Sequence, residues 1–162
     1  MKSDFYSESS KKYRSAMKQG YIEKYVLWGL GSLKLHMAKK HICSEQFDTA
    51  EVFLLKAEKK YKKLESIAEP EDRLTTFSLN FNYACIHSCK RKLAQARNDQ
   101  QLNAEESQHC ISKLVECNGS DDFKEYLTLD LLDLWYFDDF RQMDWFKRIY
   151  SSSKPKKVNA SW

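Results

Sequence analysis

Cysteine and histidine are two residue types in this chain that could bind a metal ion or take part in nucleophilic catalysis. Cys85 and Cys89 are one helical turn apart, and the next expected helix adds three further candidates, His109, Cys110 and Cys117. Four of these side chains could converge on zinc, which prefers thiolate and imidazole ligands. No Cys-x-x-Cys pair occurs, and several of the cysteines occupy positions where small apolar residues pack. Buried thiols are the favoured interpretation, and we expect neither a metal site nor a cofactor.

Nucleophilic catalysis requires a serine or cysteine held beside a base. Cys85 and His87 are two residues apart on an expected helix, so their side chains point in different directions. His36 and His41 are five residues apart and also diverge. The sequence contains no glycine-rich phosphate loop. These patterns predict a protein that is not an enzyme.

Aspartates are concentrated between residues 121 and 144, and a cluster of carboxylates could coordinate a cation. These aspartates lie at the expected starts of short helices. A negative side chain at that position caps the helix and interacts favourably with its dipole, so capping is the favoured role.

The composition favours a single all-α domain. The 162 residues include only four Gly and two Pro, too few for the many turns of an all-β fold. Apolar residues recur at spacings of three and four, which predicts helices over about Tyr21–Ile42, Phe47–Ile67, Glu71–Arg97 and Asn103–Asn118. An acidic, aromatic block from Phe123 to Tyr150 is expected to form two or three short helices.

Two glycines, Gly29 and Gly31, interrupt the first of these long helices. Each weakens a helix by about 1 kcal/mol relative to alanine. They indicate either a crossing point where another backbone lies close or a helix break near residue 30.

The chain divides into three parts. Residues 1–20 form a polar N-terminal segment, compatible with a short helix from Ser7 to Lys18. Residues 21–150 form the helical domain, and residues 151–162 form a basic tail that we expect to be disordered.

The cysteine count and the start of the chain bear on its compartment. Five cysteines are an odd number, and Met1 leads into a polar segment rather than an apolar one. This combination predicts free thiols in a reducing compartment, the cytoplasm. The longest apolar stretch, Tyr25 to Leu33, is too short to span a membrane, so we expect no membrane span.

A resemblance to tetratricopeptide-repeat (TPR) proteins adds to these predictions of fold and function. The stretch Tyr83-Ala84-Cys85-Ile86-His87-Ser88, followed by a helix ending at Asn118-Gly119, resembles the family's final repeat. Tyr126 to Ile149 is similar to the family's closing segment, and Ser32 to Leu64 resembles an earlier repeat. The family's usual Trp and Gly positions are missing from the earlier repeat, and about eleven residues, Lys90 to Gln100, lengthen the later one.

The resemblance implies a short right-handed α-solenoid of antiparallel helical hairpins with a C-terminal block of short helices. It also implies a groove lined by the first helix of each hairpin, where a protein or peptide partner would contact Ser32, Leu35, Lys39, Ser78, Phe81, Asn82 and Cys85. We therefore predict a protein–protein interaction module, a scaffold or adaptor, that binds a peptide or helix of its partner. A short solenoid exposes an apolar end, which the N-terminal segment or a second copy in a homo-oligomer would cover.

Two alternatives remain open. The aromatic C-terminal block could be the protein interface in place of the groove. A nucleic-acid-binding helical repeat would instead use a set of cations, namely Lys39, Lys40, Lys90, Arg91, Lys92 and the tail. Charge is positive over residues 1–69 and negative over 120–150, whereas nucleic-acid binders are usually basic throughout, so nucleic acid is the disfavoured partner.

Overall fold

The computed structural model describes residues 3–18, 23–69, 72–119, 129–132 and 134–152. Every secondary-structure element in these ranges is helical, which confirms the all-α prediction. The elements are α1 (Ser3–Lys18), α2 (Glu23–Cys43), α3 (Phe47–Ile67), α4 (Arg73–Ala96), α5 (Gln100–Gly119), α6 (Leu129–Leu132), the 3₁₀ helix η1 (Trp135–Phe140) and α7 (Asp144–Ser152). None of the described helices combines the length and the apolarity that a membrane span requires.

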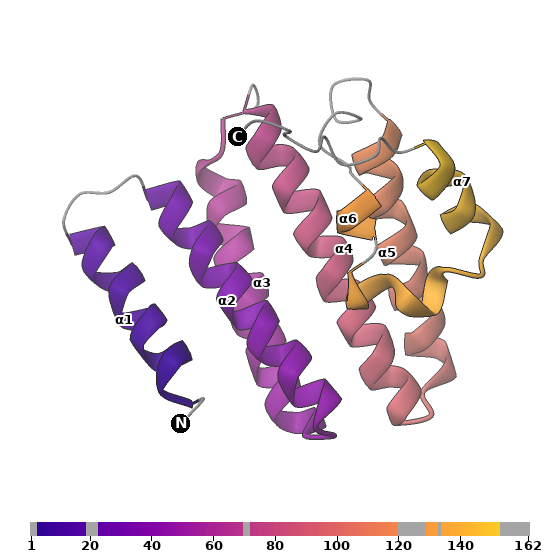
Figure 1. Cartoon of the computed structure of the whole chain (residues 1–162), viewed down its shortest axis with the longest axis horizontal. Helices are drawn as coiled ribbons and strands as arrows, with labels where there is room; N and C mark the ends of the chain where they lie inside the picture. Colours follow the sequence, from indigo (N-terminus) through magenta and orange to yellow (C-terminus); the bar gives the residue numbers. More distant parts are fainter. Residues whose placement is uncertain (1–2, 19–22, 70–71, 120–128, 133, 153–162) are drawn as a thin grey trace, which may run out of the picture.

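The long helices form two antiparallel hairpins, α2 with α3 and α4 with α5 (Figure 1). α4 also contacts both α2 and α3, so the hairpins share one core, while α1 packs against α2. The short C-terminal helices α6 and η1 lie beside α4, and α7 follows them. α2 and α4 run in the same direction, so their N-terminal ends lie at the same end of the molecule (Figure 1).

Both hairpins turn in the same way. After α2, the Gln46 N–H donates to the His41 carbonyl at 2.9 Å, and after α4 the Asp99 N–H makes the equivalent bond at 2.9 Å. The residue before each donor, Glu45 or Asn98, has a φ of 57°. This is the Schellman arrangement, in which one residue in the left-handed conformation ends the helix.

α4 ends at Ala96, one residue before the expected end, whereas the start of α5 differs from the expected one. Most of the extra residues of the second hairpin lengthen α4. α5 begins at Gln100 because Asp99, and not the expected Asn103, is its cap. The Asp99 Oδ1 accepts a hydrogen bond from the Leu102 N–H at 3.0 Å, which satisfies a helix-terminal donor.

The two glycines of α2 each allow a tyrosine ring to lie close against the helix backbone. A Cβ at Gly31 would lie 2.6 Å from the nearest ring atom of Tyr61, and a Cβ at Gly29 would overlap the ring of Tyr13. α2 is continuous through both glycines, so the predicted helix break is wrong. The groups that approach are tyrosine side chains, and not the neighbouring backbone that the crossing-point alternative required.

Four of the five cysteines, Cys85, Cys89, Cys110 and Cys117, lie in the core, while Cys43 is exposed and none forms a disulfide. Burial raises the pKa of both Cys110 and Cys117 to about 12 and raises the pKa of the other two core thiols as well. Buried, protonated thiols behave as small apolar side chains. This is the role that the sequence favoured over zinc binding.

The ends of the chain match the expectations in part. α1 begins at Ser3, before the expected start at Ser7, and ends at Lys18 as expected. The C-terminal block contains three short helices in its described residues. Of the tail that was expected to be disordered, Ser151 and Ser152 are instead the last residues of α7, and the positions from 153 onwards lie outside the described ranges.

Candidate binding site

The aromatic helix η1 lies against the C-terminal half of α2 and against α4 from Phe81 to Lys92. The Lys39 Nζ of α2 lies 5.3 Å from the centroid of the Trp135 ring and 5.7 Å from that of Tyr136. On α4, the Phe81 ring packs edge-on against Phe137, with centroids 5.7 Å apart. This end of the groove between α2 and α4 is therefore filled by the chain's own aromatic segment.

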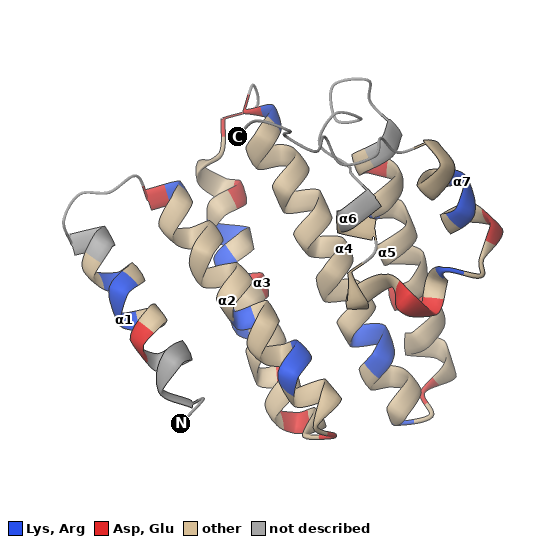
Figure 2. Cartoon of the chain, viewed as in Figure 1, with Lys and Arg blue, Asp and Glu red and all other residues tan. Residues whose placement is uncertain are grey.

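Two cations of α4 hold η1 through Asp139. Arg91 Nη1 donates to its carboxylate at 2.8 Å and Lys92 Nζ at 2.6 Å. Partial burial acts to raise the pKa of Asp139, but the hydrogen bonds and charges of Lys92 and Arg91 together outweigh it and lower the pKa. Figure 2 shows the acidic part of η1 beside a basic stretch of α4. These contacts hold an aromatic, acidic segment of the chain against α2 and α4.

The predicted partner-binding residues do not form one surface. Leu35, Phe81 and Cys85 are buried in the core, where no partner can contact them in this conformation. Lys39 lies over η1. These four positions belong to the interior or to the filled end of the groove.

Of the remaining predicted residues, Ser32 and Asn82 meet at the hydroxyl of Tyr61, and Ser78 is bonded to Asn82. Tyr61 is fully buried, and its hydroxyl donates to Asn82 Oδ1 at 3.0 Å and lies 3.1 Å from Ser32 Oγ. The Asn82 amide in turn donates to the Ser78 carbonyl at 2.6 Å. These bonds satisfy a buried polar group and tie α2, α3 and α4 together.

The groove stays open at the N-terminal ends of α2 and α4. A mainly apolar pocket of about 270 Å³ lies there, lined by Lys24, Tyr25, Trp28, Leu64, Asp72, Leu74, Thr75 and Ser78. Tyr25, Trp28 and Leu74 are 61%, 45% and 54% exposed. Exposed aromatic and apolar side chains that rim a cavity are typical of protein interaction sites.

The charged edge of this pocket is neutralised internally. Lys24 Nζ lies 2.5 Å from Asp72 Oδ2. Asp72 is also the N-cap of α4, because its Oδ1 accepts a hydrogen bond from the Thr75 N–H at 3.0 Å. The hydrogen bond from Lys24 and the bonds from Thr75 lower the pKa of Asp72 to about 2. Since these two charges satisfy each other, the pocket offers mainly apolar contacts.

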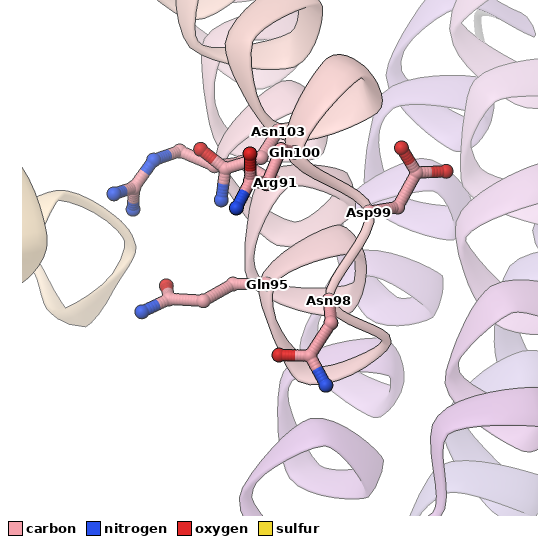
Figure 3. A pocket seen from close by; sticks show the side chains of 6 residues that line it. All are labelled: Arg91, Gln95, Asn98, Asp99, Gln100 and Asn103. Carbon is pink, nitrogen blue, oxygen red and sulfur yellow. The ribbon is translucent and has the colours of Figure 1, made fainter.

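Another cavity, of about 340 Å³, lies beside the turn between α4 and α5 and is polar (Figure 3). In the close-up, the Gln95 and Asp99 side chains point away from each other. Most of the lining residues are exposed, and the Arg91 guanidinium is bound to Asp139. This cavity provides no convergent set of polar groups for a ligand.

The cations required by the nucleic-acid alternative contact other parts of this chain. Lys90 Nζ donates to Glu58 at 3.2 Å, and Arg91 and Lys92 bind Asp139. A nucleic-acid phosphate would have to displace these carboxylates. The displacement reduces the binding free energy that these cations would gain by neutralising the phosphate charge.

The residues predicted from the sequence to line the groove do not include Tyr25, Trp28 or Leu74. Their spacing contains the signal, because Tyr25 and Trp28 precede Ser32 by seven and four residues, and Leu74 precedes Ser78 by four. Residues at these intervals share one helix face. Extending the predicted groove toward the helix starts would have included them.

No protein-family model, curated protein or solved structure matches this chain. Its function is therefore inferred from its own residues.

Proposed function

We propose that this chain is a TPR-like helical-repeat protein that binds a peptide segment of a partner protein in the open end of the groove between α2 and α4. The pocket between exposed Trp28 and Leu74 is the observation that supports this proposal most directly. Its volume of about 270 Å³ is near the lower limit of ligand pockets, roughly 300 Å³. A pocket of this size accommodates a large apolar side chain of an otherwise surface-bound peptide.

The repeated hairpin supports the TPR-like part of the proposal. Both hairpins place their first helix beside the groove and end that helix with the same turn, at Glu45 and Asn98. The four long helices contain 20 to 24 residues each, whereas a whole TPR unit of two helices contains about 34. The likeness therefore lies in the arrangement of the hairpins and not in their length.

The packing of η1 indicates which kind of chain the groove accepts. At the filled end, Trp135 and Phe137 supply aromatic contacts, while Asp139 meets two cations. At the open end the aromatic contacts are available from Trp28 and Tyr25, but the Lys24 charge is already paired. We therefore expect the partner peptide to insert apolar side chains and to bind with little dependence on salt concentration.

A peptide-display selection tests this proposal. A library of random peptides is selected on the wild-type chain, and the enriched peptides are then measured against a Trp28→Ala, Leu74→Ala variant. Both side chains are largely exposed, so the variant should keep its helical fold, which circular dichroism checks. Leu55→Ala is the matched control, because it removes an equally exposed apolar side chain from α3 outside the pocket.

The selected peptides should share a large apolar residue and should lose at least about tenfold in affinity on the double variant, equivalent to roughly 1.4 kcal/mol. Their affinity for the Leu55→Ala chain should not change. Enrichment of no peptide, or equal binding to the double variant, would contradict the assignment of this pocket. A steep loss of affinity with added salt would instead favour a charged ligand.

A further inference from the structure

The interface between α4 and α5 contains a cluster of metal-ligating side chains that does not overlap the pocket. It is formed by His87 on α4 and by Glu106 and His109 on α5. One ligand atom from each of these residues lies within 4.8 Å of the other two. Among the described residues, no other group of histidine, cysteine and acidic side chains meets this condition.

Glu106 is the unusual member of the cluster, because it is a carboxylate in the interior. It is only 8% exposed, and its Oε2 lies 2.6 Å from His87 Nδ1. A buried carboxylate is unfavourable unless it is paired or coordinates a metal. His109 extends the group to the surface, with its ring centroid 5.0 Å from that of His87, so the cluster is open to solvent on one side.

The positions of the three residues follow from the hairpin. Glu106 and His109 are three residues apart on α5, so they project from the same face, and a Glu-x-x-His spacing supplies ligands in metal-binding helical bundles. His87 approaches from the antiparallel helix α4, which packs directly against α5. Two rigid helices therefore present two imidazole nitrogens and one carboxylate oxygen to one point.

We propose that His87, Glu106 and His109 bind a divalent transition-metal ion, with zinc the preferred ion. Two imidazoles and one carboxylate form a donor set that zinc uses when it keeps a fourth position open for water or an incoming ligand. Tetrahedral zinc with bonds of about 2.0–2.1 Å places its ligand atoms roughly 3.3 Å apart. Small rotations of the three side chains would reach this geometry from the observed separations of up to 4.8 Å.

The core cysteines do not compete for this ion. Cys110 is adjacent to His109 in sequence, but it is fully buried and its Sγ is not part of the converging group of ligand atoms. The ligands are thus nitrogen and oxygen. The sequence prediction of no metal site weighed the cysteines with His109, and the aspartates between residues 121 and 144, but did not pair His87 with Glu106.

Isothermal titration with Zn²⁺ tests the site directly. The chain is prepared without a histidine tag, freed of metal with a chelator, and carries Cys43→Ser to remove the one exposed cysteine. Three single variants are compared in this background, His109→Ala, Glu106→Gln and, as the control, His36→Ala on α2. His109 is exposed, so its removal should leave the fold intact, and Glu106→Gln preserves the size of the buried side chain.

The parent chain and the His36→Ala variant should each bind one Zn²⁺ per chain, and Zn²⁺ should raise their thermal unfolding temperature. His109→Ala and Glu106→Gln should weaken binding at least roughly 100-fold, since even changes to residues behind metal ligands cost 10- to 100-fold. Co²⁺ absorption should report the same site.

Absence of stoichiometric binding, or equal binding by the His109→Ala chain, would overturn the proposal and leave His87 and Glu106 as a structural pair. Peptide binding in the pocket does not depend on this result.

Discussion

Arg91 Nη1 and Asp139 Oδ2 lie 2.8 Å apart and join two segments that are 48 residues apart in the sequence. The contact fixes the aromatic helix η1 against α4, and Lys92 adds a second bond to the same carboxylate. The groove and the aromatic block were predicted as alternative interfaces. In the structure they are one packed region, which leaves the N-terminal end of the groove as the accessible part.

Loss of the Asp139 charge should loosen η1. Asp139→Asn leaves Arg91, which is only 9% exposed, without its anionic partner. We expect the free energy of unfolding to fall by about 1–2 kcal/mol, since the carboxylate itself is partly exposed. Hydrogen exchange of the backbone amides of residues 135–140 should become faster, and urea unfolding should measure the loss.

Asp138→Asn is the matched control, because Asp138 is exposed and pairs with Arg141, three residues away on the same segment. It should change stability by less than about 0.5 kcal/mol. Equal effects of the two substitutions would show that the contact with α4 does not hold η1.

Acid should weaken the edge of the pocket through Asp72. Its folded-state pKa of about 2 lies below the unfolded value of about 3.9, so its charge stabilises the fold above about pH 4. That stabilisation is lost progressively as the pH falls from about 4 toward 2. Asp72→Asn keeps a residue suited to N-capping but removes the Lys24 ion pair, so its stability should depend less on pH over this range.

Urea unfolding at about pH 6 and at about pH 3 would measure the effect of Asp72. Asp72→Ala should in addition lose the cap and about 1 kcal/mol at both pH values. If wild type and Asp72→Asn lose the same stability on acidification, other carboxylates account for the acid sensitivity.

The long helices were predicted well because the apolar spacing that indicates a helix lies within the helix itself. The apolar spacing from Phe47 to Ile67 reproduces the bounds of α3. The start of α5 was misplaced because Asn103 and Asp99 are both good caps. Only the hydrogen bond from Leu102 to Asp99 distinguishes them.

The candidate site was harder to predict because it depends on long-range packing. Nothing local to Lys39 or Phe81 shows that residues from η1 will cover them. The same limit applies to His87 and Glu106, which are 19 residues apart and meet only because α4 and α5 pair in a particular register. Helical periodicity identifies the face on which a residue lies, but not the residue that it meets on the neighbouring helix.

Gly31→Ala should destabilise the fold even though alanine is the better helix former. The new methyl group would meet the ring of Tyr61, which is fully buried and bonded through its hydroxyl to Asn82. Overpacking costs about 1–3 kcal/mol, which exceeds the gain of about 1 kcal/mol in helix propensity. We expect a net loss of about 1–2 kcal/mol in urea unfolding.

Gly29→Ala provides the comparison for this prediction. Its methyl group would meet Tyr13 of α1, which is partly exposed and can move aside. The variant should therefore lose less stability than Gly31→Ala, or gain some. A larger loss at Gly29 would indicate that α1 is held as rigidly as α3.

Glu45→Gly should stabilise the turn between α2 and α3. Glu45 has a φ of 57°, where a side chain costs about 1–2 kcal/mol that glycine avoids, and it is exposed. Asn98 has the same φ, but asparagine tolerates this conformation, so Asn98→Gly should gain less.

Ser44→Gly is the control, because its φ is not positive and glycine would only add freedom to the unfolded chain. Thermal unfolding should therefore rank Glu45→Gly above Asn98→Gly and both above Ser44→Gly. An equal response of the three positions would contradict the shared Schellman geometry of the two hairpins.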